Sequence, residues 1–127
     1  MTKTAKEMVT DAKAQVENLT PQQVAEEAQN GALILDVRDG EERQQEGNLP
    51  GSVHVPRGML EFQADPASPY HNAALEPDKR VILHCASGGR SALAAKTLKE
   101  MGYTDVAHLD GGFTAWKEQG LPVEKDK

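Results

Sequence analysis

Four short apolar runs punctuate this sequence, and segments with a helical pattern lie between them. The clearest run, 32–37, directly follows the turn signal Asn30-Gly31 and is typical of a strand buried on both faces of a sheet. The runs cover 32–37, 53–55, 81–83 and 106–109. Because strands that alternate with helices form mainly parallel sheets, the pattern predicts an α/β domain. A length of 127 residues is close to the commonest domain size, so we expect one core.

Helical spacing and helix-capping residues mark the segments between these runs. Thr20 and Pro21 are residue types preferred just before a helix and at its first position, and Gly102 is typical of the position after a helix end. The expected helices cover 5–16, 21–29, 58–62, 92–101 and 113–119. A sixth segment, 41–46, is expected to be a solvated helix face.

Composition and charge exclude several classes of protein. The 20 acidic and 14 basic residues give a net charge of −6, whereas general nucleic-acid binders are usually basic. The longest aliphatic runs have about four residues, and a membrane span needs about 20. No apolar signal core follows the N-terminal lysines, so we expect a cytoplasmic protein. Neither a nucleic acid nor a membrane is an expected partner.

Cys85 is the single cysteine of the chain, which excludes an internal disulfide and an all-cysteine zinc site. The four histidines are scattered without a paired spacing, so no metal site is expected. A lone cysteine is often only a small buried hydrophobe. The residues that follow Cys85 favour a nucleophile instead, because together they form a loop suited to bind an anion.

Cys85 stands where a buried strand is expected to end, and Gly88 and Gly89 follow it before a helix begins. In open α/β sheets, ligands bind outside the carboxyl ends of the strands. A helix N-terminus after a glycine-rich turn presents free N–H groups and the positive end of the helix dipole. Both features favour an anion, so we expect this position to stabilise the thiolate of Cys85. Arg90 is expected to add positive charge or to brace the loop.

Four stretches of the sequence together resemble the rhodanese family of sulfurtransferases, specifically its single-domain form. They are 35–38, 47–56, 85–91 and 109–116, in the order and spacing of that family. The resemblance covers residues 18–124 and implies a rhodanese-like three-layer domain, with about five mainly parallel strands flanked by helices. Residues 1–17 are expected to form an amphipathic helix that is extra to this domain. It either packs on its own domain, which we favour, or presents its apolar stripe to a second subunit.

The resemblance implies a mechanism centred on Cys85. In rhodaneses the loop cysteine takes the outer sulfur of a donor such as thiosulfate, becomes a persulfide and passes the sulfur to a thiophilic acceptor. Cys85 is then the catalytic residue, and no metal or organic cofactor is implied. The implied partners are a small anionic sulfur donor and a thiol, cyanide or protein acceptor. The residues implied to bind the substrate and the persulfide are Ala86, Ser87, Gly88, Gly89, Arg90 and Ser91.

Two features of this loop refine the expected substrate. Four residues separate Cys85 from Arg90, as in the sulfurtransferases, whereas the related cell-cycle and arsenate-reducing enzymes have five. A phosphatase is therefore not expected. Ala86 and Ser87 replace the charged or aromatic loop residues of many thiosulfate enzymes, so we expect poor thiosulfate turnover and keep a persulfide as the alternative donor.

Residues near the other strand ends are candidates for supporting roles. Arg57 follows the run 53–55 and is expected either to bind the donor anion or to be a solvated surface arginine. Asp36 and Arg38 are expected to form a structural ion pair rather than to act in catalysis. His84 adjoins Cys85 but should point to the opposite face of the strand, so it is not expected to be a general base.

Three functions remain open at this point. The leading one is a sulfurtransferase that works through a Cys85 persulfide. The alternative is a persulfide carrier or sensing module that serves one protein partner with little small-molecule turnover, and a deeply shielded Cys85 would favour it. The third is an inactive structural domain, against which the retained cysteine, glycines and Arg90 argue. The oligomeric state, monomer or homodimer, stays open as well.

Overall fold

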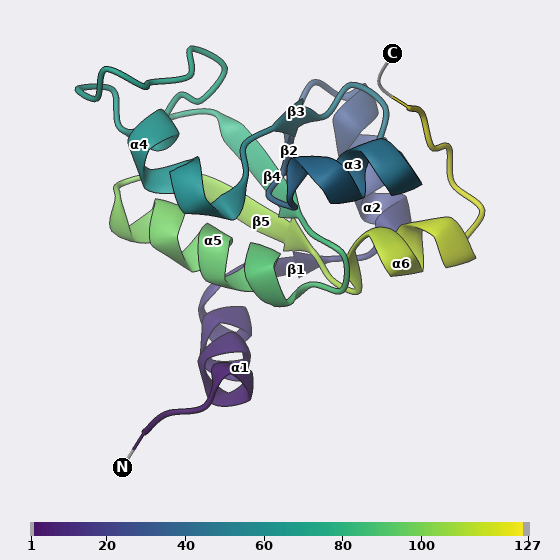
Figure 1. Ribbon diagram of the computed structural model, residues 1–127, viewed down its shortest axis with the longest axis horizontal. Coiled ribbons are helices and arrows are strands. Elements are labelled where there is room, and N and C mark those ends of the chain that lie inside the picture. Colours follow the sequence, from purple (N-terminus) through teal and green to yellow (C-terminus); the bar gives the residue numbers. More distant parts are fainter. Residues whose placement is uncertain (1, 126–127) are drawn as a thin grey trace.

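Five parallel strands form one sheet at the centre of the computed structural model, which describes residues 2–125 (Figure 1). Their order across the sheet is β1-β5-β4-β2-β3, and each neighbouring pair is parallel. The sheet confirms the predicted α/β class. The strands are β1 (Glu17–Leu19), β2 (Leu33–Asp36), β3 (Val53–His54), β4 (Arg80–His84) and β5 (Asp105–Leu109).

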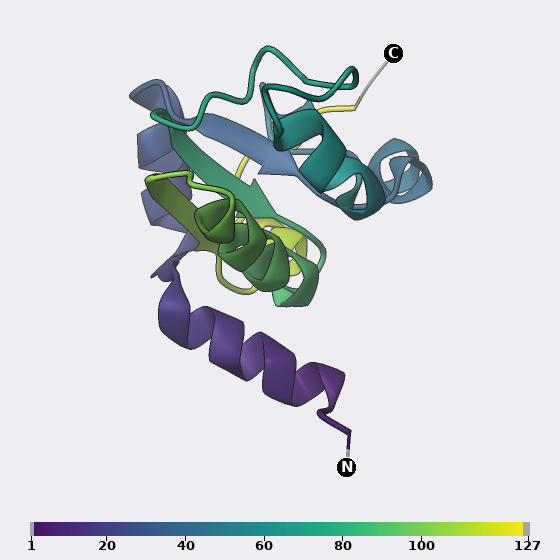
Figure 2. The same cartoon turned by 90° about the vertical axis from the view of Figure 1, so that its left-hand side faces the viewer.

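Helices cover both faces of the sheet, which gives the domain three layers (Figures 1 and 2). Helices α4 and α5 contribute to the core on one face, and helices α2 and α6 to the core on the other. The helices are α1 (Ala5–Gln15), α2 (Pro21–Gln29), α3 (Gly40–Glu46), α4 (Leu60–Ala64), α5 (Gly89–Glu100) and α6 (Gly112–Glu118), with a 3-10 turn η1 over Arg57–Met59.

The side chains of the central strands alternate between these two cores. Leu35 and Leu83 pack in the core under α4 and α5, whereas Ile34 and Ile82 pack in the core under α2 and α6. All four side chains are at most 4% exposed, as expected for strands covered on both faces. Cys85, the residue after β4, belongs to the core on the α5 side.

Two differences from the sequence predictions bear on the site. Strand β1 was not predicted, because only Leu19 of its three residues is buried and no apolar run marks it. Helix α5 begins at Gly89 rather than at residue 92, so Arg90 and Ser91 lie in its first turn. The first turn of a helix leaves its N–H groups without intrahelical acceptors, so the earlier start brings these amides closer to Cys85.

Helix α1 lies outside the three layers and packs against α5 (Figure 2). Thr4 caps its first turn through a reciprocal capping box with Glu7. Its one fully buried residue is Ala12, and Lys13 forms an ion pair of 3.2 Å with Asp110, which follows β5. Within residues 2–125, no helix has the length and apolar character needed to cross a membrane.

Candidate active site

Cys85 lies at the carboxyl end of β4, at the start of the short loop that leads into α5. The loop turns at Gly88, whose φ of 104° lies in the left-handed region that favours glycine. A Cβ added at Gly88 would lie 3.2 Å from the backbone nitrogen of Gly111, which is tighter than ordinary contact. Both the backbone angle and this close approach explain why a glycine stands here.

Two backbone amides of the loop point at the sulfur of Cys85. The amide of Gly88 donates to Sγ at 3.2 Å, and the amide of Ser91 donates to it at 3.4 Å. The thiol itself donates to Oγ of Ser91, with 3.6 Å between sulfur and oxygen. Cys85 is 1% exposed, so these groups surround it away from water. Such an arrangement stabilises negative charge on Sγ once the thiol proton is removed.

The N-terminus of α6 holds the first two carbonyls of the loop. The amide of Phe113 donates to the carbonyl of Cys85 at 2.8 Å, and the amide of Thr114 donates to that of Ala86 at 3.0 Å. This contact requires Gly112, because a Cβ there would lie 2.6 Å from the carbonyl carbon and oxygen of Ala86. Gly112, the first residue of α6, therefore fixes the position of the Cys85 loop.

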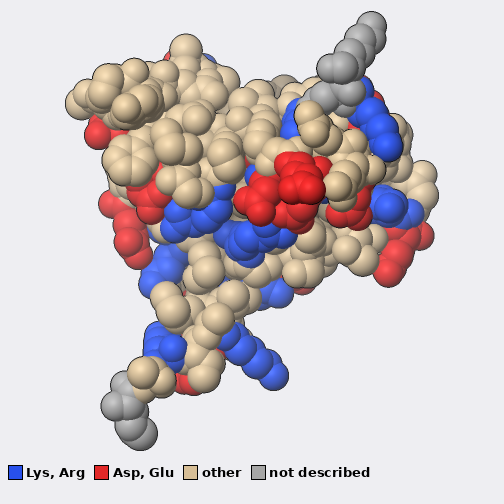
Figure 3. Space-filling model, viewed as in Figure 1, with Lys and Arg blue, Asp and Glu red and all other residues tan. Residues whose placement is uncertain are grey.

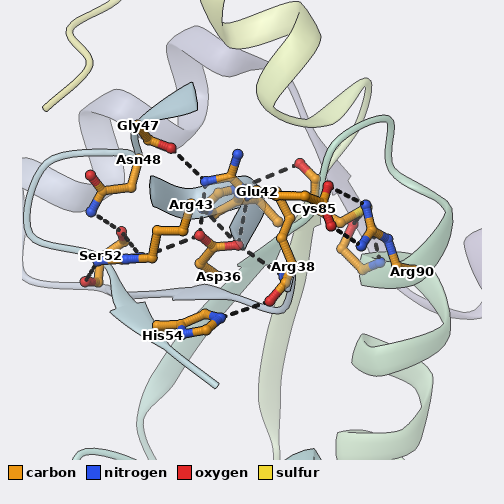
Figure 4. A network of polar contacts seen from close by, with 12 residues as sticks. Asp36, Arg38, Glu42, Arg43, Gly47, Asn48, Ser52, His54, Cys85 and Arg90 are labelled. Carbon is orange, nitrogen blue, oxygen red and sulfur yellow. Dashed lines mark hydrogen bonds and ion pairs between the residues drawn. The ribbon is translucent and has the colours of Figure 1, made fainter. Parts of the chain in front are cut away.

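Arg90 leaves the loop toward α3, where it meets Glu42 (Figure 4). Its guanidinium donates to both carboxylate oxygens of Glu42, at 2.7 and 2.9 Å. The hydrogen bond from Arg90 lowers the pKa of the Glu42 carboxyl, and the same contact raises the pKa of Arg90. The predicted bracing role of Arg90 thus has a partner, Glu42, that the sequence did not reveal.

Asp36 and Arg38 form a buried ion pair behind the loop (Figure 4). Two guanidinium nitrogens of Arg38 donate to the two carboxylate oxygens of Asp36 at 3.0 and 2.9 Å, and both side chains are 0% exposed. Burial raises the pKa of Asp36, but the hydrogen bonds from Arg38 outweigh it and lower that pKa to about 2. The guanidinium of Arg38 also lies 4.4 Å from the ring centre of Phe113.

Arg43 joins this network, which corrects one prediction. The segment 41–46 was expected to be a solvated helix face, yet Arg43 within α3 is only 7% exposed. Its guanidinium donates to Asp36 at 3.2 Å and to the hydroxyl of Ser52 at 3.0 Å. The buried carboxylate of Asp36 attracts this arginine into the core. Because Asp36 lies outside the segment, the residue pattern of 41–46 does not reveal this contact.

Arg57 has other partners in this structure than the Cys85 loop. Its guanidinium donates to Glu61 at 3.0 Å and to the hydroxyl of Thr97 at 3.3 Å. Thr97 lies six residues after Ser91 along α5. The role of Arg57 in binding a donor anion therefore stays a prediction.

His84 points away from Cys85, into the core under α6. Its ring stacks on that of Phe113, with 6.4 Å between the ring centres. The side chain is fully buried, and burial lowers the pKa of His84 to about 4, so the ring is neutral at pH 7. Among residues 2–125, no group of three histidine, cysteine or carboxylate side chains gathers in a way that could hold a metal ion.

A second histidine, His108, lies on the cysteine side of the sheet. Its Nδ1 is 3.0 Å from the hydroxyl of Ser91, and its Nε2 is 2.7 Å from Oδ1 of Asn18. Sequence reasoning treated His108 as one of four scattered histidines and did not single out Asn18. The sequence carried no signal for this contact, because Asn18 and His108 become direct partners only through the pairing of β1 with β5.

Comparison with known proteins decides the family. Residues 20–119 match the rhodanese-like domain. The chain belongs to the rhodanese family. It is 30% identical, over 84% of its length and 92% of the relative's, to the thiosulfate sulfurtransferase GlpE of Haemophilus influenzae. Its relatives of this kind support sulfur transfer as the general activity.

Two solved structures extend the comparison. The polysulfide-sulfur transferase homodimer of Wolinella succinogenes has a TM-score of 0.77 and 32% identity, covering 96% of this chain and 88% of that one. A protein of unknown function from Rhodopseudomonas palustris, described as a possible tyrosine phosphatase, has a TM-score of 0.92 and 42% identity, covering 98% and 96%. In the present chain, four residues separate Cys85 from Arg90, which is the spacing expected for sulfur transfer and not for a phosphatase.

Proposed function

We propose that this rhodanese-family protein transfers sulfane sulfur through a persulfide on Cys85. The thiolate of Cys85 attacks the outer sulfur of the donor, forming a new S–S bond. With thiosulfate, the sulfur–sulfur bond of the donor breaks and sulfite leaves with the electron pair. An acceptor thiolate or cyanide then attacks the outer sulfur of the persulfide, and the Cys85 thiolate departs with the bonding electrons. Two steps of this kind replace one difficult transfer.

The observation that carries this proposal is the pair of amides, from Gly88 and Ser91, that donate to Sγ. Both amides are oriented toward the atom on which negative charge develops during the reaction. The loop is held from two sides, by α6 through its carbonyls and by α3 through the Arg90–Glu42 pair. A preorganised loop of this type suits a sulfur anion, because little reorganisation accompanies the reaction.

The surface charge around the loop bears on the donor. The chain carries a net charge of −6, yet Figure 3 shows Lys and Arg side chains gathered on the face formed by α5 and α1. Acidic side chains lie beside them, over α3. Cations of these two helices are paired with carboxylates, Arg90 with Glu42 and Lys13 with Asp110, so the charge around the loop is mixed. Thiosulfate and a polysulfide are both candidates, and the Wolinella succinogenes relative is named for the latter.

Burial of Cys85 favours a second candidate function. Cys85 is 1% exposed, and a cysteine shielded to this degree is expected of a persulfide carrier that serves one protein partner. A carrier and an enzyme share the same site and differ in the acceptor. Rapid and repeated discharge of the persulfide by cyanide or small thiols supports the enzyme, whereas discharge only with a protein partner supports the carrier.

The intact mass of the protein, measured before and after incubation with thiosulfate or polysulfide, tests the proposal. We expect a gain of one sulfur atom that cyanide reverses. The variant Cys85→Ser should show no gain while keeping the fold, because the chain contains no other cysteine. Sulfur loading in Cys85→Ser, or no loading of the natural chain by either donor, would overturn the assignment.

A further inference from the structure

A chain of buried polar contacts leads away from the sulfur of Cys85. Ser91 Oγ lies 3.6 Å from Sγ and 3.0 Å from Nδ1 of His108. Nε2 of the same ring lies 2.7 Å from Oδ1 of Asn18. Ser91 and His108 are both 0% exposed. The side chains come from α5, β5 and β1, so the folded sheet brings together three distant segments of the sequence.

Asn18 determines which nitrogen of His108 carries the hydrogen. The amide nitrogen of Asn18 donates to the carbonyl of Lys13 at 2.9 Å and to that of Val16 at 3.0 Å, which occupies both of its hydrogens. The oxygen Oδ1 must therefore face His108, and an oxygen of this kind only accepts. His108 consequently carries its hydrogen on Nε2, and its Nδ1 has a free lone pair.

The environment of His108 keeps the ring neutral before reaction. Burial lowers its pKa to about 4. The charged groups that act on the ring, Asp110 and Lys13, shift this pKa in opposite directions and form an ion pair with each other at 3.2 Å. At neutral pH, Nδ1 is thus an acceptor, and the hydroxyl of Ser91 is the donor within reach.

The hydroxyl of Ser91 has one hydrogen and two neighbouring acceptors. The carbonyl of Gly88 is 3.4 Å away, whereas Nδ1 of His108 is 3.0 Å away and would otherwise be buried without a partner. The shorter contact takes the hydrogen. The oxygen of Ser91 then presents a lone pair to Cys85, and the thiol hydrogen points toward that lone pair.

We propose that His108 is the proton acceptor for Cys85, reached through the hydroxyl of Ser91 and oriented by Asn18. The thiol proton moves from Sγ to Oγ of Ser91 as the hydroxyl proton moves from Oγ to Nδ1 of His108. The S–H and O–H bonds break, new O–H and N–H bonds form, and the pair becomes a thiolate and an imidazolium. The inference rests on the proposed function, since it prepares the nucleophile for that reaction.

Both products of this step have partners in place. The thiolate accepts from the amides of Gly88 and Ser91 and now also from the hydroxyl of Ser91. The imidazolium donates from Nδ1 to Ser91 and from Nε2 to Asn18. No side chain has to rotate. When the persulfide has given up its sulfur, the proton returns along the same path to the Cys85 thiolate.

Glutamine can replace the hydrogen bonds of a histidine, but it cannot replace a histidine that accepts a proton. In His108→Gln, the amide oxygen accepts from Ser91 and the amide nitrogen donates to Asn18, but the side chain cannot take up a proton at neutral pH. Ser91→Ala removes the hydroxyl, and Ser91→Thr keeps it. His71→Gln is the matched control, since His71 only contacts the carbonyl of Leu75, outside the site.

The rate of sulfur loading as a function of pH distinguishes these roles. For His108→Gln and Ser91→Ala we expect a loss of about 100-fold at pH 7, within the range for general acid–base catalysis. The loss should shrink as pH rises, because hydroxide then removes the thiol proton. His71→Gln should load like the natural chain, and Ser91→Thr should load faster than Ser91→Ala because it keeps the hydroxyl. A loss in His108→Gln that is equal at all pH values, or no loss, would overturn the proposal.

One measurement needs neither a variant nor a sulfur donor. The nitrogen chemical shifts of His108 in the natural chain should identify the Nε2–H form, and an Nδ1–H form would refute the assignment. Absence of loading in the natural chain, by contrast, refutes the proposed function alone.

Discussion

Replacing Gly112 by alanine tests whether α6 sets the position of the Cys85 loop. The new Cβ would lie 2.6 Å from the carbonyl carbon and oxygen of Ala86, which is 0.8 Å short of ordinary contact at 3.4 Å. All of these atoms near the substitution are backbone, so the loop itself must shift. A displacement approaching 1 Å at a reacting group can lower a rate by about 100-fold. We expect sulfur loading by Gly112→Ala to fall by about 10- to 100-fold.

The same substitution also destabilises the fold. The φ of Gly112 is +61°, and an L-residue in that region costs about 1–2 kcal/mol. Overpacking adds about 1–3 kcal/mol. Urea unfolding should therefore show a loss of about 2–5 kcal/mol.

Gly120→Ala is the matched control for this experiment. Gly120 has a φ of +71°, similar to that of Gly112, but a Cβ there meets nothing within 4 Å. It should lose only the backbone cost of about 1–2 kcal/mol and keep its loading rate. If Gly112→Ala loads sulfur as fast as Gly120→Ala, the close approach of α6 does not position the loop and the reasoning fails.

Three further predictions concern the charged groups. Arg38→Met leaves the Asp36 carboxylate buried with fewer partners and should cost about 3–5 kcal/mol in urea unfolding. Adding Asp36→Asn to the same chain should restore part of the lost stability. A loss below about 1 kcal/mol in Arg38→Met would contradict the role of the buried pair. Because burial lowers the pKa of both His84 and His108 from 6.5 to about 4, protonation of either ring favours the unfolded chain, and about 3 kcal/mol per histidine should be lost as pH falls from 6.5 to 4. About 2 kcal/mol more should be lost between pH 4 and pH 2. The pKa of Asp36 is lowered from 3.8 to about 2 in the folded chain, so over this range the unfolded chain binds the proton more readily. A flat unfolding midpoint from pH 7 to pH 4 would refute the histidine contribution. Arg90→Ala and Glu42→Ala should each slow sulfur loading, and the double variant should be no slower than Arg90→Ala. Because the pair is partly exposed, its coupling energy in urea unfolding should stay below about 1 kcal/mol. Fully additive effects of the two substitutions on the loading rate would refute a shared role.

The sequence was sufficient to locate the cysteine loop, because its signals are local. Cys85, Gly88 and Ser91 lie within seven consecutive residues, and each has a direct meaning at a strand end or a helix start. The buried runs 32–37 and 81–83 were equally clear, since strands covered on both faces have apolar residues at every position. These elements define two adjacent strands, β2 and β4, and the place of the nucleophile.

The partners of the loop could not be predicted in the same way. Glu42 and Arg43 belong to a segment whose polar pattern is that of a solvated helix, and their roles depend on charges brought close by other elements. His108 and Asn18 become neighbours only through the pairing of β1 with β5. Two of the three residues of β1 are exposed, so its pattern does not identify a strand.

The place of β1 in the sheet has a consequence for how the protein is made. This strand lies near the start of the chain, yet it pairs with β5, and the contact between Asn18 and His108 spans 90 residues. Contacts of such separation form late, because the long intervening chain must first be ordered. A chain emerging from the ribosome therefore exposes Cys85 before His108 and its partner strand can pair. The amides of Gly88 and Ser91 belong to the cysteine's own loop, whereas the contact between His108 and Asn18 exists only once β1 has paired with β5.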